Sequence, residues 1–144
     1  MPYPEQFIAP MRAELTRLGV RELRTSADVD AAVTAPGVTM FVVNSVCGCA
    51  AGKARPGIAL ALQHDRRPDL VGTVFAGADV DATDRARAYF APFPPSSPSV
   101  GLLRDGKLVF MMQRSDIENR DARQIAERLT AAFDQHCQSP VRSA

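Results

Sequence analysis

The stretch that most limits the possible folds of this chain is an apolar run over residues 38–44, Val-Thr-Met-Phe-Val-Val-Asn. Its β-branched and aromatic residues favour a strand. The run lacks the apolar–polar alternation of a strand with one face in water, so we expect it to be buried on both faces. Such a strand occupies the centre of a sheet that carries helices on both sides. The run therefore predicts an α/β fold.

Alternating elements on either side of this run support the same fold class. Helical spacing and capping residues predict helices over residues 4–18, 26–35, 48–64 and 79–90, and a last helical region from residue 115. Apolar runs predict further strands over residues 20–23, 70–75, 99–104 and 107–112. Asp105-Gly106 between the last two strands is a strong β-hairpin signal. We expect a parallel sheet core with an antiparallel C-terminal hairpin.

Local details of these elements can also be predicted. One domain is expected over residues 1–144, with a frayed tail from about residue 138. In the first helix, four apolar residues recur at helical spacing: Phe7, Met11, Leu15 and Leu18. Ser26 or Asp28 is the expected cap of the second helix. Pro56 lies inside the third predicted helix, where its missing N–H predicts a kink.

Charge and composition exclude several classes of partner. The formal net charge is +1 and Trp is absent, so neither a nucleic-acid surface nor binding to an acidic membrane is expected. No apolar stretch approaches the roughly 20 residues that span a bilayer. The N-terminal residues show no basic region followed by an apolar core, so no signal peptide is expected. We therefore expect a cytoplasmic protein.

Two cysteines follow the central strand, with a single glycine between them. Cys47-Gly48-Cys49 precedes a small-residue stretch that can begin a helix, and a helix N-terminus favours the thiolate over the thiol. In a reducing compartment such a pair is more often catalytic or metal-binding than structural. Its placement predicts that Cys47, in the strand-to-helix turn, is the attacking thiolate and that Cys49 is the resolving thiol.

The spacing of the pair also limits its geometry. Residues i and i+2 of a regular helix point about 200° apart, so at least one of the two cysteines must lie outside helical geometry if they are to pair. Gly48 tolerates the unusual dihedral angles that a tight ring demands. A disulfide closing so small a ring should be strained and readily reduced, which suits a transient catalytic bond.

Other interpretations of the cysteines have less support. Buried, inert cysteines would be one alternative, and a metal or iron–sulfur module another. A closed zinc site requires four ligands. The other candidate ligands lack paired-ligand spacing: Cys137, His64 and His136. We therefore expect no metal, and we expect Cys137 to be a half-buried helix residue.

Basic residues and a proline-rich loop complete the candidate site. Lys53 and Arg55 follow the cysteine pair. They are candidates to receive the carboxylates of a small thiol or to raise the thiolate fraction at Cys47. The alternative is that both lie on a solvated helix face. Pro98 precedes a predicted strand. A cis peptide bond there would turn the backbone toward the cysteines and offer main-chain groups to a substrate; the alternative is a plain proline-rich turn.

The segment Asn-Ser-Val-Cys-Gly-Cys over residues 44–49, with Ala-Arg-Pro at 54–56 and Phe-Pro-Pro-Ser-Ser-Pro-Ser at 93–99, resembles the bacilliredoxin family. The likeness covers nearly the whole chain. It implies a thioredoxin-like three-layer α/β/α sandwich with a mixed sheet. It also implies that Cys47 matches the attacking cysteine, Cys49 the resolving one and Pro98 the cis-proline. Asn44, Ser45 and Gly48 are then supporting residues, and Ser97 is a further candidate for substrate binding.

The resemblance implies a cytoplasmic thiol-disulfide oxidoreductase. Bacilliredoxins are linked to the removal of bacillithiol from S-bacillithiolated proteins and to disulfide reductase or isomerase activity. No bound cofactor is then expected. Bacillithiol or another low-molecular-weight thiol would be a co-substrate, and the partners would be thiol-modified client proteins and a recycling reductase or thiol. A protein disulfide isomerase is the alternative enzyme.

Overall fold

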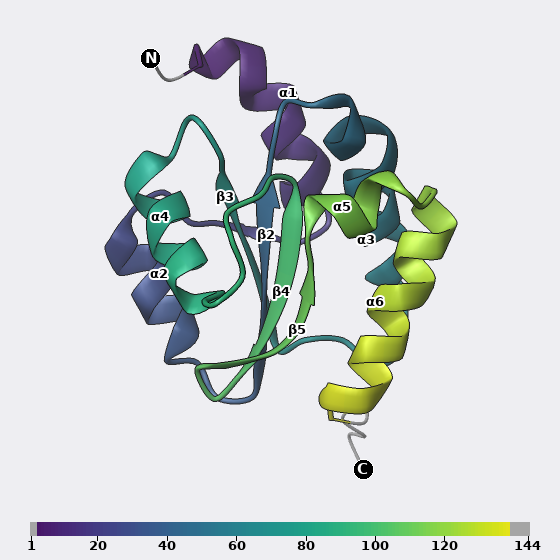
Figure 1. The fold of residues 1–144 in the computed structure, drawn as a ribbon. Coiled ribbons are helices and arrows are strands. Elements are labelled where there is room, and N and C mark those ends of the chain that lie inside the picture. The colour runs from purple at the N-terminus through teal and green to yellow at the C-terminus, as the bar shows by residue number, and fades with distance from the viewer. Residues whose placement is uncertain (1–2, 139–144) are drawn as a thin grey trace.

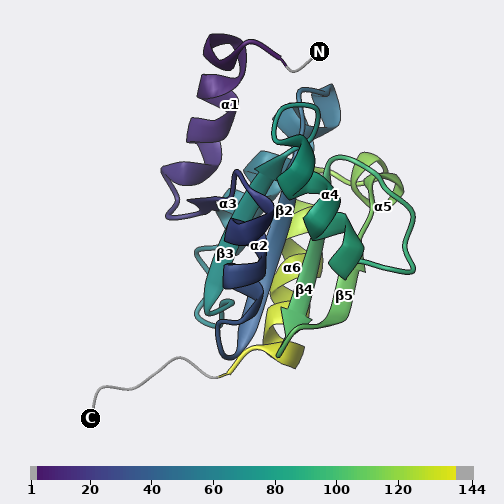
Figure 2. The same cartoon turned by 90° about the vertical axis from the view of Figure 1, so that its left-hand side faces the viewer.

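A computed structural model describes residues 3–138 and shows a five-stranded mixed sheet between two layers of helices (Figures 1 and 2). The strands are β1 (Arg21–Glu22), β2 (Val38–Asn44), β3 (Leu70–Phe75), β4 (Ser99–Arg104) and β5 (Lys107–Met112). The helices are α1 (Glu5–Thr16), α2 (Ser26–Val33), the π-helical turn η1 (Ala50–Ala54), α3 (Arg55–Ala61), α4 (Val80–Tyr89), α5 (Arg114–Glu118) and α6 (Ala122–His136). The predicted α/β class is confirmed.

The order of the strands is β1-β3-β2-β4-β5, which places β2 in the centre. Strand β3 runs parallel to both β1 and β2, whereas β4 is antiparallel to β2 and to β5. Helices α2 and α4 cover one face of the sheet, and α3 and α6 cover the other (Figure 1). The carboxyl ends of β2 and β3 therefore lie at one edge, the upper edge in Figure 1.

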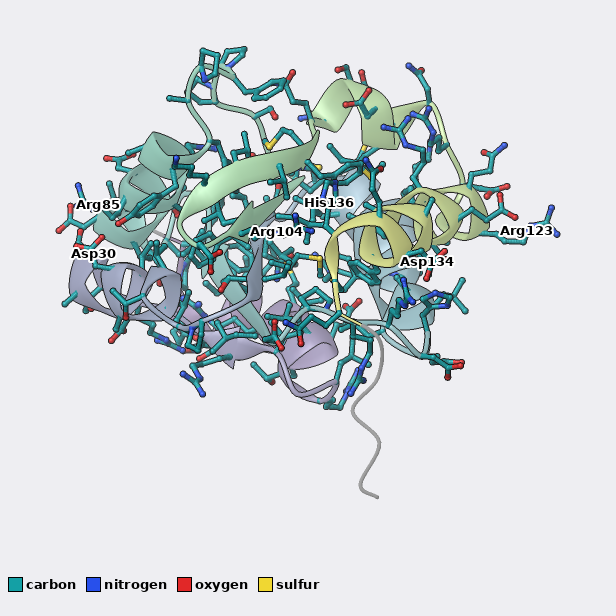
Figure 3. All side chains as sticks on the ribbon, turned by 90° about the horizontal axis from the view of Figure 1, so that it is seen from below. Asp30, Arg85, Arg104, Arg123, Asp134 and His136 are labelled. Atoms are coloured by element: carbon teal, nitrogen blue, oxygen red, sulfur yellow. The ribbon has the colours of Figure 1, made fainter. Side chains whose placement is uncertain are left out.

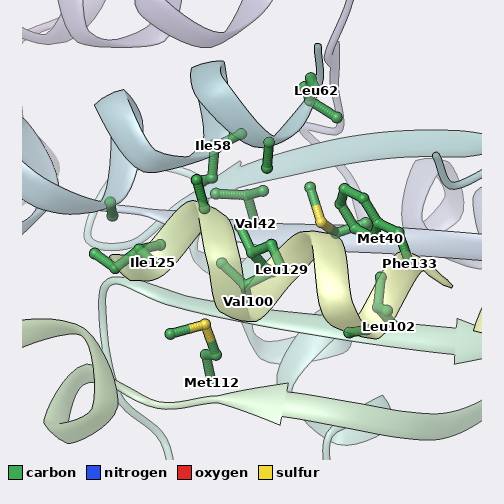
Figure 4. Packing of buried hydrophobic residues seen from close by; sticks show 14 of the residues in the cluster. Met40, Val42, Ile58, Leu62, Val100, Leu102, Met112, Ile125, Leu129 and Phe133 are labelled. Carbon is green, nitrogen blue, oxygen red and sulfur yellow. The ribbon is translucent and has the colours of Figure 1, made fainter. Parts of the chain in front are cut away.

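The two faces of β2 explain its unbroken apolar run. Met40 and Val42 pack toward α3 and α6 in the larger core cluster (Figure 4), while Phe41 and Val43 pack toward α2 and α4 in the second. Every residue of β2 is buried. Because successive side chains of a strand point to opposite faces, a strand covered on both faces has no polar position in its middle.

The buried face of α1 differs from the predicted stripe. Phe7 and Leu18 are exposed, and the residues that face the protein are Ile8, Arg12 and Leu15. The apolar periodicity misled because a charged residue occupies a core-facing position. The Arg12 guanidinium is buried against the carboxylate of Asp79, which lies 67 residues further along the chain. Sequence periodicity alone does not reveal such a pair.

Helix boundaries are set by caps that the sequence predicted only in part. The cap of α2 is Thr25, whose hydroxyl accepts from the Asp28 N–H while the Asp28 carboxylate accepts from the Thr25 N–H, so neither predicted cap was right. The last helical region is two helices, α5 and α6, each with its own capping box. Pro56 lies in the first turn of α3, directly after η1, where its missing N–H is tolerated.

The hairpin was predicted correctly. Strands β4 and β5 are joined by Asp105 (φ 50°) and Gly106 (φ 82°), and two successive residues with positive φ are typical of a type I′ turn. The predicted frayed tail from about residue 138 lies almost wholly outside the described residues. Within residues 3–138, no helix combines the length and apolar character that crossing a bilayer requires.

Candidate active site

Both cysteines of the pair lie at the carboxyl end of the central strand. Strand β2 ends at Asn44, the chain bends through Cys47, and Gly48 and Cys49 begin the next helix. Cys49 has helical dihedral angles (φ −64°, ψ −34°), and the Cys47 carbonyl accepts the first helical hydrogen bond, from the Ala50 N–H at 3.0 Å. Both side chains are half-buried free thiols. The prediction that Cys47 lies in the turn, outside the helix, is confirmed.

Gly48 is exposed and has room for a side chain. A Cβ atom built there would meet no heavy atom within 4 Å, and the φ of Gly48 is not in the left-handed region. The thiol form of the protein therefore makes no special demand on this glycine. The expected need for glycine concerns the closed Cys47–Cys49 ring and stays a prediction.

The surroundings of Cys47 favour its thiolate. Burial raises the pKa of the Cys47 thiol, but the Ser45 hydroxyl, the backbone N–H groups of Ala50 and Cys49 and the charge of Arg114 lower it by more, so its pKa lies below the ordinary value. Ser45 Oγ also accepts from the Cys47 N–H at 3.2 Å. The N–H groups belong to the first helical turn, as the sequence predicted.

Arg114 is a site residue that sequence reasoning missed. It opens α5, where its N–H donates to Ser96 Oγ at 3.3 Å and its Nε contacts Glu118 Oε2 at 3.3 Å. The hydrogen bond with Glu118 raises the pKa of Arg114, and so do the charges of Cys47 and Cys49. Its side chain is half exposed. No motif surrounds it, and it reaches the cysteines only because α5 lies beside η1.

Arg55 is not at the surface. It is buried, its Nε contacts Glu14 Oε1 at 3.0 Å, and its Nη1 donates to Asn44 Oδ1 and to the Ser45 carbonyl, both at 2.9 Å. This corrects two of the three expectations for Arg55, since a guanidinium with these partners neither receives a substrate carboxylate nor lies on a solvated face; an influence on the Cys47 thiolate stays a prediction. The cause is the π-helical turn η1, which precedes Arg55 and changes the face on which it lies.

Lys53 and the proline-rich loop border the cysteine turn. Lys53 Nζ donates to the Glu118 carbonyl at 2.5 Å, which links η1 to α5. Ser97 is half-buried, and the Ser97–Pro98 peptide bond is cis, which confirms the prediction for Pro98. The Ala91–Pro92 bond is also cis and was not predicted.

The sheet register places Pro98 beside the reactive turn. Val43 of β2 pairs with Ser99 of β4 in antiparallel register, so the next position along brings Pro98 opposite Asn44. Ser99 Oγ donates to the Ser96 carbonyl at 3.0 Å, and Gln113 Nε2 donates to the Pro94 carbonyl at 3.1 Å. The loop is thus held between β4 and α5, at the same edge as the cysteines.

The remaining thiol and the two histidines lie away from this edge. Cys137 is buried just after α6, and burial raises its pKa to about 11. His64 Nε2 is 2.7 Å from Asp134 Oδ1, and the His136 carbonyl accepts from Arg104 at the lower end of the sheet (Figure 3). Among residues 3–138, no three His, Cys, Asp or Glu side chains are grouped so that they could hold a metal ion.

The pKa directions predict selective alkylation. Iodoacetamide reacts with thiolates, so the rate at each cysteine rises with pH through its pKa and then levels off. We expect the midpoint for Cys47 below the ~8.5 of a free cysteine, and Cys137 to stay unmodified at neutral pH in the folded protein. Peptide mass spectrometry after timed quenching measures both. A Cys47 midpoint at or above that of a free cysteine would contradict the expectation.

Comparison with known proteins places this geometry in context. A protein-family model described as "Disulphide isomerase" matches residues 3–137. A bacilliredoxin of Koribacter versatilis is 61% identical over 136 residues, covering 94% of each chain. A bacilliredoxin of Geobacillus kaustophilus is 50% identical over 137 residues, covering 95% of this chain and 94% of its own.

Solved structures share the fold at low sequence identity. A mutant thioredoxin from Halobacterium salinarum superposes with a TM-score of 0.57 at 13% identity, covering 82% of this chain and 90% of its own. A thioredoxin from Fasciola hepatica gives a TM-score of 0.54 at 15% identity, over 81% and 99%. The fold is therefore thioredoxin-like, as predicted, and the set of relatives supports a thiol-based redox enzyme.

Proposed function

Since this chain belongs to the bacilliredoxin family, we propose that it removes bacillithiol, a low-molecular-weight thiol, from S-bacillithiolated client proteins. The observation that carries the proposal is the position of Cys47. It is a half-buried thiol at the end of the central strand, with a hydroxyl, two N–H groups and an arginine that favour its thiolate. A solvent-accessible thiol with a lowered pKa is the attacking group that disulfide exchange needs.

The proposed reaction has two exchange steps. The Cys47 thiolate attacks the bacillithiol sulfur of the mixed disulfide, the bond to the client breaks, and the client sulfur leaves as a thiolate that takes up a proton. Cys49, after losing its proton, then attacks the Cys47 sulfur and releases bacillithiol, which leaves a Cys47–Cys49 disulfide. Two electrons and two protons return both cysteines to thiols; they come from a recycling reductase or from two molecules of a small thiol, which leave as their disulfide. A reducing cytoplasm is the proposed setting.

Cationic groups beside the pair suit an anionic thiol. Arg114 acts electrostatically on both cysteines, and its side chain is half exposed. The role of receiving a carboxylate of the small thiol, first expected for Arg55, is here assigned to Arg114. Lys53 and Ser97 border the same turn. In this proposal Arg114 receives a carboxylate of the small thiol while Cys47 attacks its sulfur.

The proposal predicts a specific adduct. We expect Cys49→Ala, incubated with a bacillithiolated protein, to gain the mass of bacillithiol on Cys47 while the client thiol is released, because the resolving thiol is absent. Intact-mass spectrometry measures both products. A glutathionylated client is the matched control for the choice of thiol. Transfer from the glutathionylated client alone would reject bacillithiol, and no transfer from either by a folded protein would reject de-thiolation.

A protein disulfide isomerase is the second candidate function. It is favoured by the match of residues 3–137 to the "Disulphide isomerase" family model. Recovery of scrambled ribonuclease activity, compared with release of a small thiol from a client, separates the two. Isomerase activity without thiol release would favour this second candidate.

A further inference from the structure

Arg55 is a buried charged residue that the exchange chemistry does not use directly. It is 3% exposed and opens α3, immediately after the π-helical turn. Its guanidinium donates to three oxygens, those of the Glu14 carboxylate, the Asn44 side chain and the Ser45 carbonyl. Burying a charge is costly unless it is paired and hydrogen-bonded, so this site is built around the guanidinium.

Ser45 is held from both sides by this cluster. Its N–H donates to Asn44 Oδ1 at 2.9 Å, and its carbonyl accepts from Arg55 Nη1 at 2.9 Å. Asn44 is itself anchored, because its Nδ2 donates to the Met11 carbonyl of α1 at 3.2 Å. The peptide groups on both sides of Ser45 are thus fixed, which fixes the direction of its Cα–Cβ bond, and its Oγ accepts from the Cys47 N–H at 3.2 Å.

We propose that Arg55 is a positioning residue for the redox reaction: its guanidinium fixes the Asn44–Ser45 turn so that the Ser45 hydroxyl is held against Cys47. The proposal rests on the proposed function of Cys47 as the attacking thiol. Arg55 acts through Ser45 and not through its charge, because Glu14 lies 3.0 Å away and balances that charge. Arg114 from α5 is the charged side chain that acts on Cys47 directly.

The test is the pH dependence of Cys47 alkylation in a Cys49→Ala background. We expect Arg55→Lys and Ser45→Ala each to raise the midpoint of alkylation by about one pH unit, because each removes about one hydrogen bond to a charged group. A rise of this size means about tenfold less Cys47 thiolate at neutral pH. The double variant should shift no further than Ser45→Ala alone, because both changes remove the same contact. The plateau rate at high pH should not fall.

Arg12→Lys is the matched control. Arg12 is also buried and paired with carboxylates, but its partners are Glu5 and Asp79, not the cysteine turn. We expect it to leave the Cys47 midpoint unchanged. If Arg55→Lys does not fold, Asn44→Ala cuts the link between Arg55 Nη1 and the Ser45 N–H and should shift the midpoint in the same direction.

Two results would overturn the proposal. One is a folded Arg55→Lys, or Asn44→Ala in its place, with an unchanged midpoint. The other is a double variant whose shift equals the sum of the single shifts, since independent effects add. Iodoacetamide alkylation requires no disulfide exchange. The role of Arg55 can therefore be rejected or supported whether or not the protein removes bacillithiol.

Discussion

Cys47→Ser is expected to reduce thiol–disulfide exchange to the rate of buffer alone, while Cys49→Ser keeps the first exchange step and loses closure of the ring. A serine hydroxyl fits the space of the thiol, so the turn and the fold should persist. Its proton is far harder to remove, and the groups that act on Cys47, which are a hydroxyl, backbone N–H groups and an arginine, are not bases that would remove it. The loss is therefore chemical and not structural.

Release of a small thiol from a mixed-disulfide protein, followed by mass spectrometry, measures this prediction. Cys137→Ser is the matched control: it removes a thiol that is buried and whose pKa is raised, so exchange should continue at the unaltered rate. Full exchange by Cys47→Ser would show that Cys47 is not the attacking thiol. Loss of the first step in Cys49→Ser but not in Cys47→Ser would reverse the order of the pair.

Arg12→Ala is expected to cause a large loss of stability, although Arg12 lies away from the cysteines. Arg12 Nη1 and Nη2 contact the two Asp79 oxygens at 2.8 Å each, Glu5 lies 3.0 Å from Nε, and the guanidinium stacks 5.3 Å from the Phe75 ring centroid. Removing one partner of a buried pair leaves the other charge unpaired, which costs about 3–5 kcal/mol. A typical domain has only about 5–15 kcal/mol in total.

Urea and thermal unfolding measure this loss. A fall of roughly 10 °C in the melting temperature is expected, at about 2–4 °C per kcal/mol for a domain near this size. Arg85→Ala is the matched control, because Arg85 contacts Asp30 at 2.7 Å but both side chains are largely in water. Such an exposed pair contributes little to stability, because water screens it. An equal, small effect of both substitutions would contradict the prediction.

The features that the sequence predicted correctly have local signals. The run at β2 lacks an apolar–polar alternation because both of its faces are covered, and Asp105-Gly106 is a turn that few other residue pairs allow. The position of Cys47 outside the helix follows from the angle between neighbouring side chains on a helix. The cis bond before Pro98 was inferred from the cysteines together with a proline ahead of a strand.

The features that it missed depend on contacts between distant residues. Arg12 and Asp79 are far apart along the chain, and no periodicity marks a buried pair. Arg55 is buried against Glu14, 41 residues earlier in the chain, after η1 has changed the helical phase. Arg114 approaches the cysteines only through the packing of α5 beside η1 and the loop that holds Ser96.

The location of Cys137 limits which disulfides one molecule can form. The charges of Asp69 and Arg104 act on Cys137, so both residues lie near it. Asp69 accepts a hydrogen bond from the Val38 N–H, and Arg104 pairs with Val38 in the sheet, so Cys137 lies near the start of β2. Cys47 follows the other end of the same strand. Seven residues of strand separate the two ends by about 20 Å, whereas disulfide-bonded Cα atoms lie within about 7 Å. A disulfide between Cys137 and Cys47 or Cys49 of the same molecule is therefore excluded while the sheet is intact. Within one folded molecule, an oxidant can form only the Cys47–Cys49 disulfide.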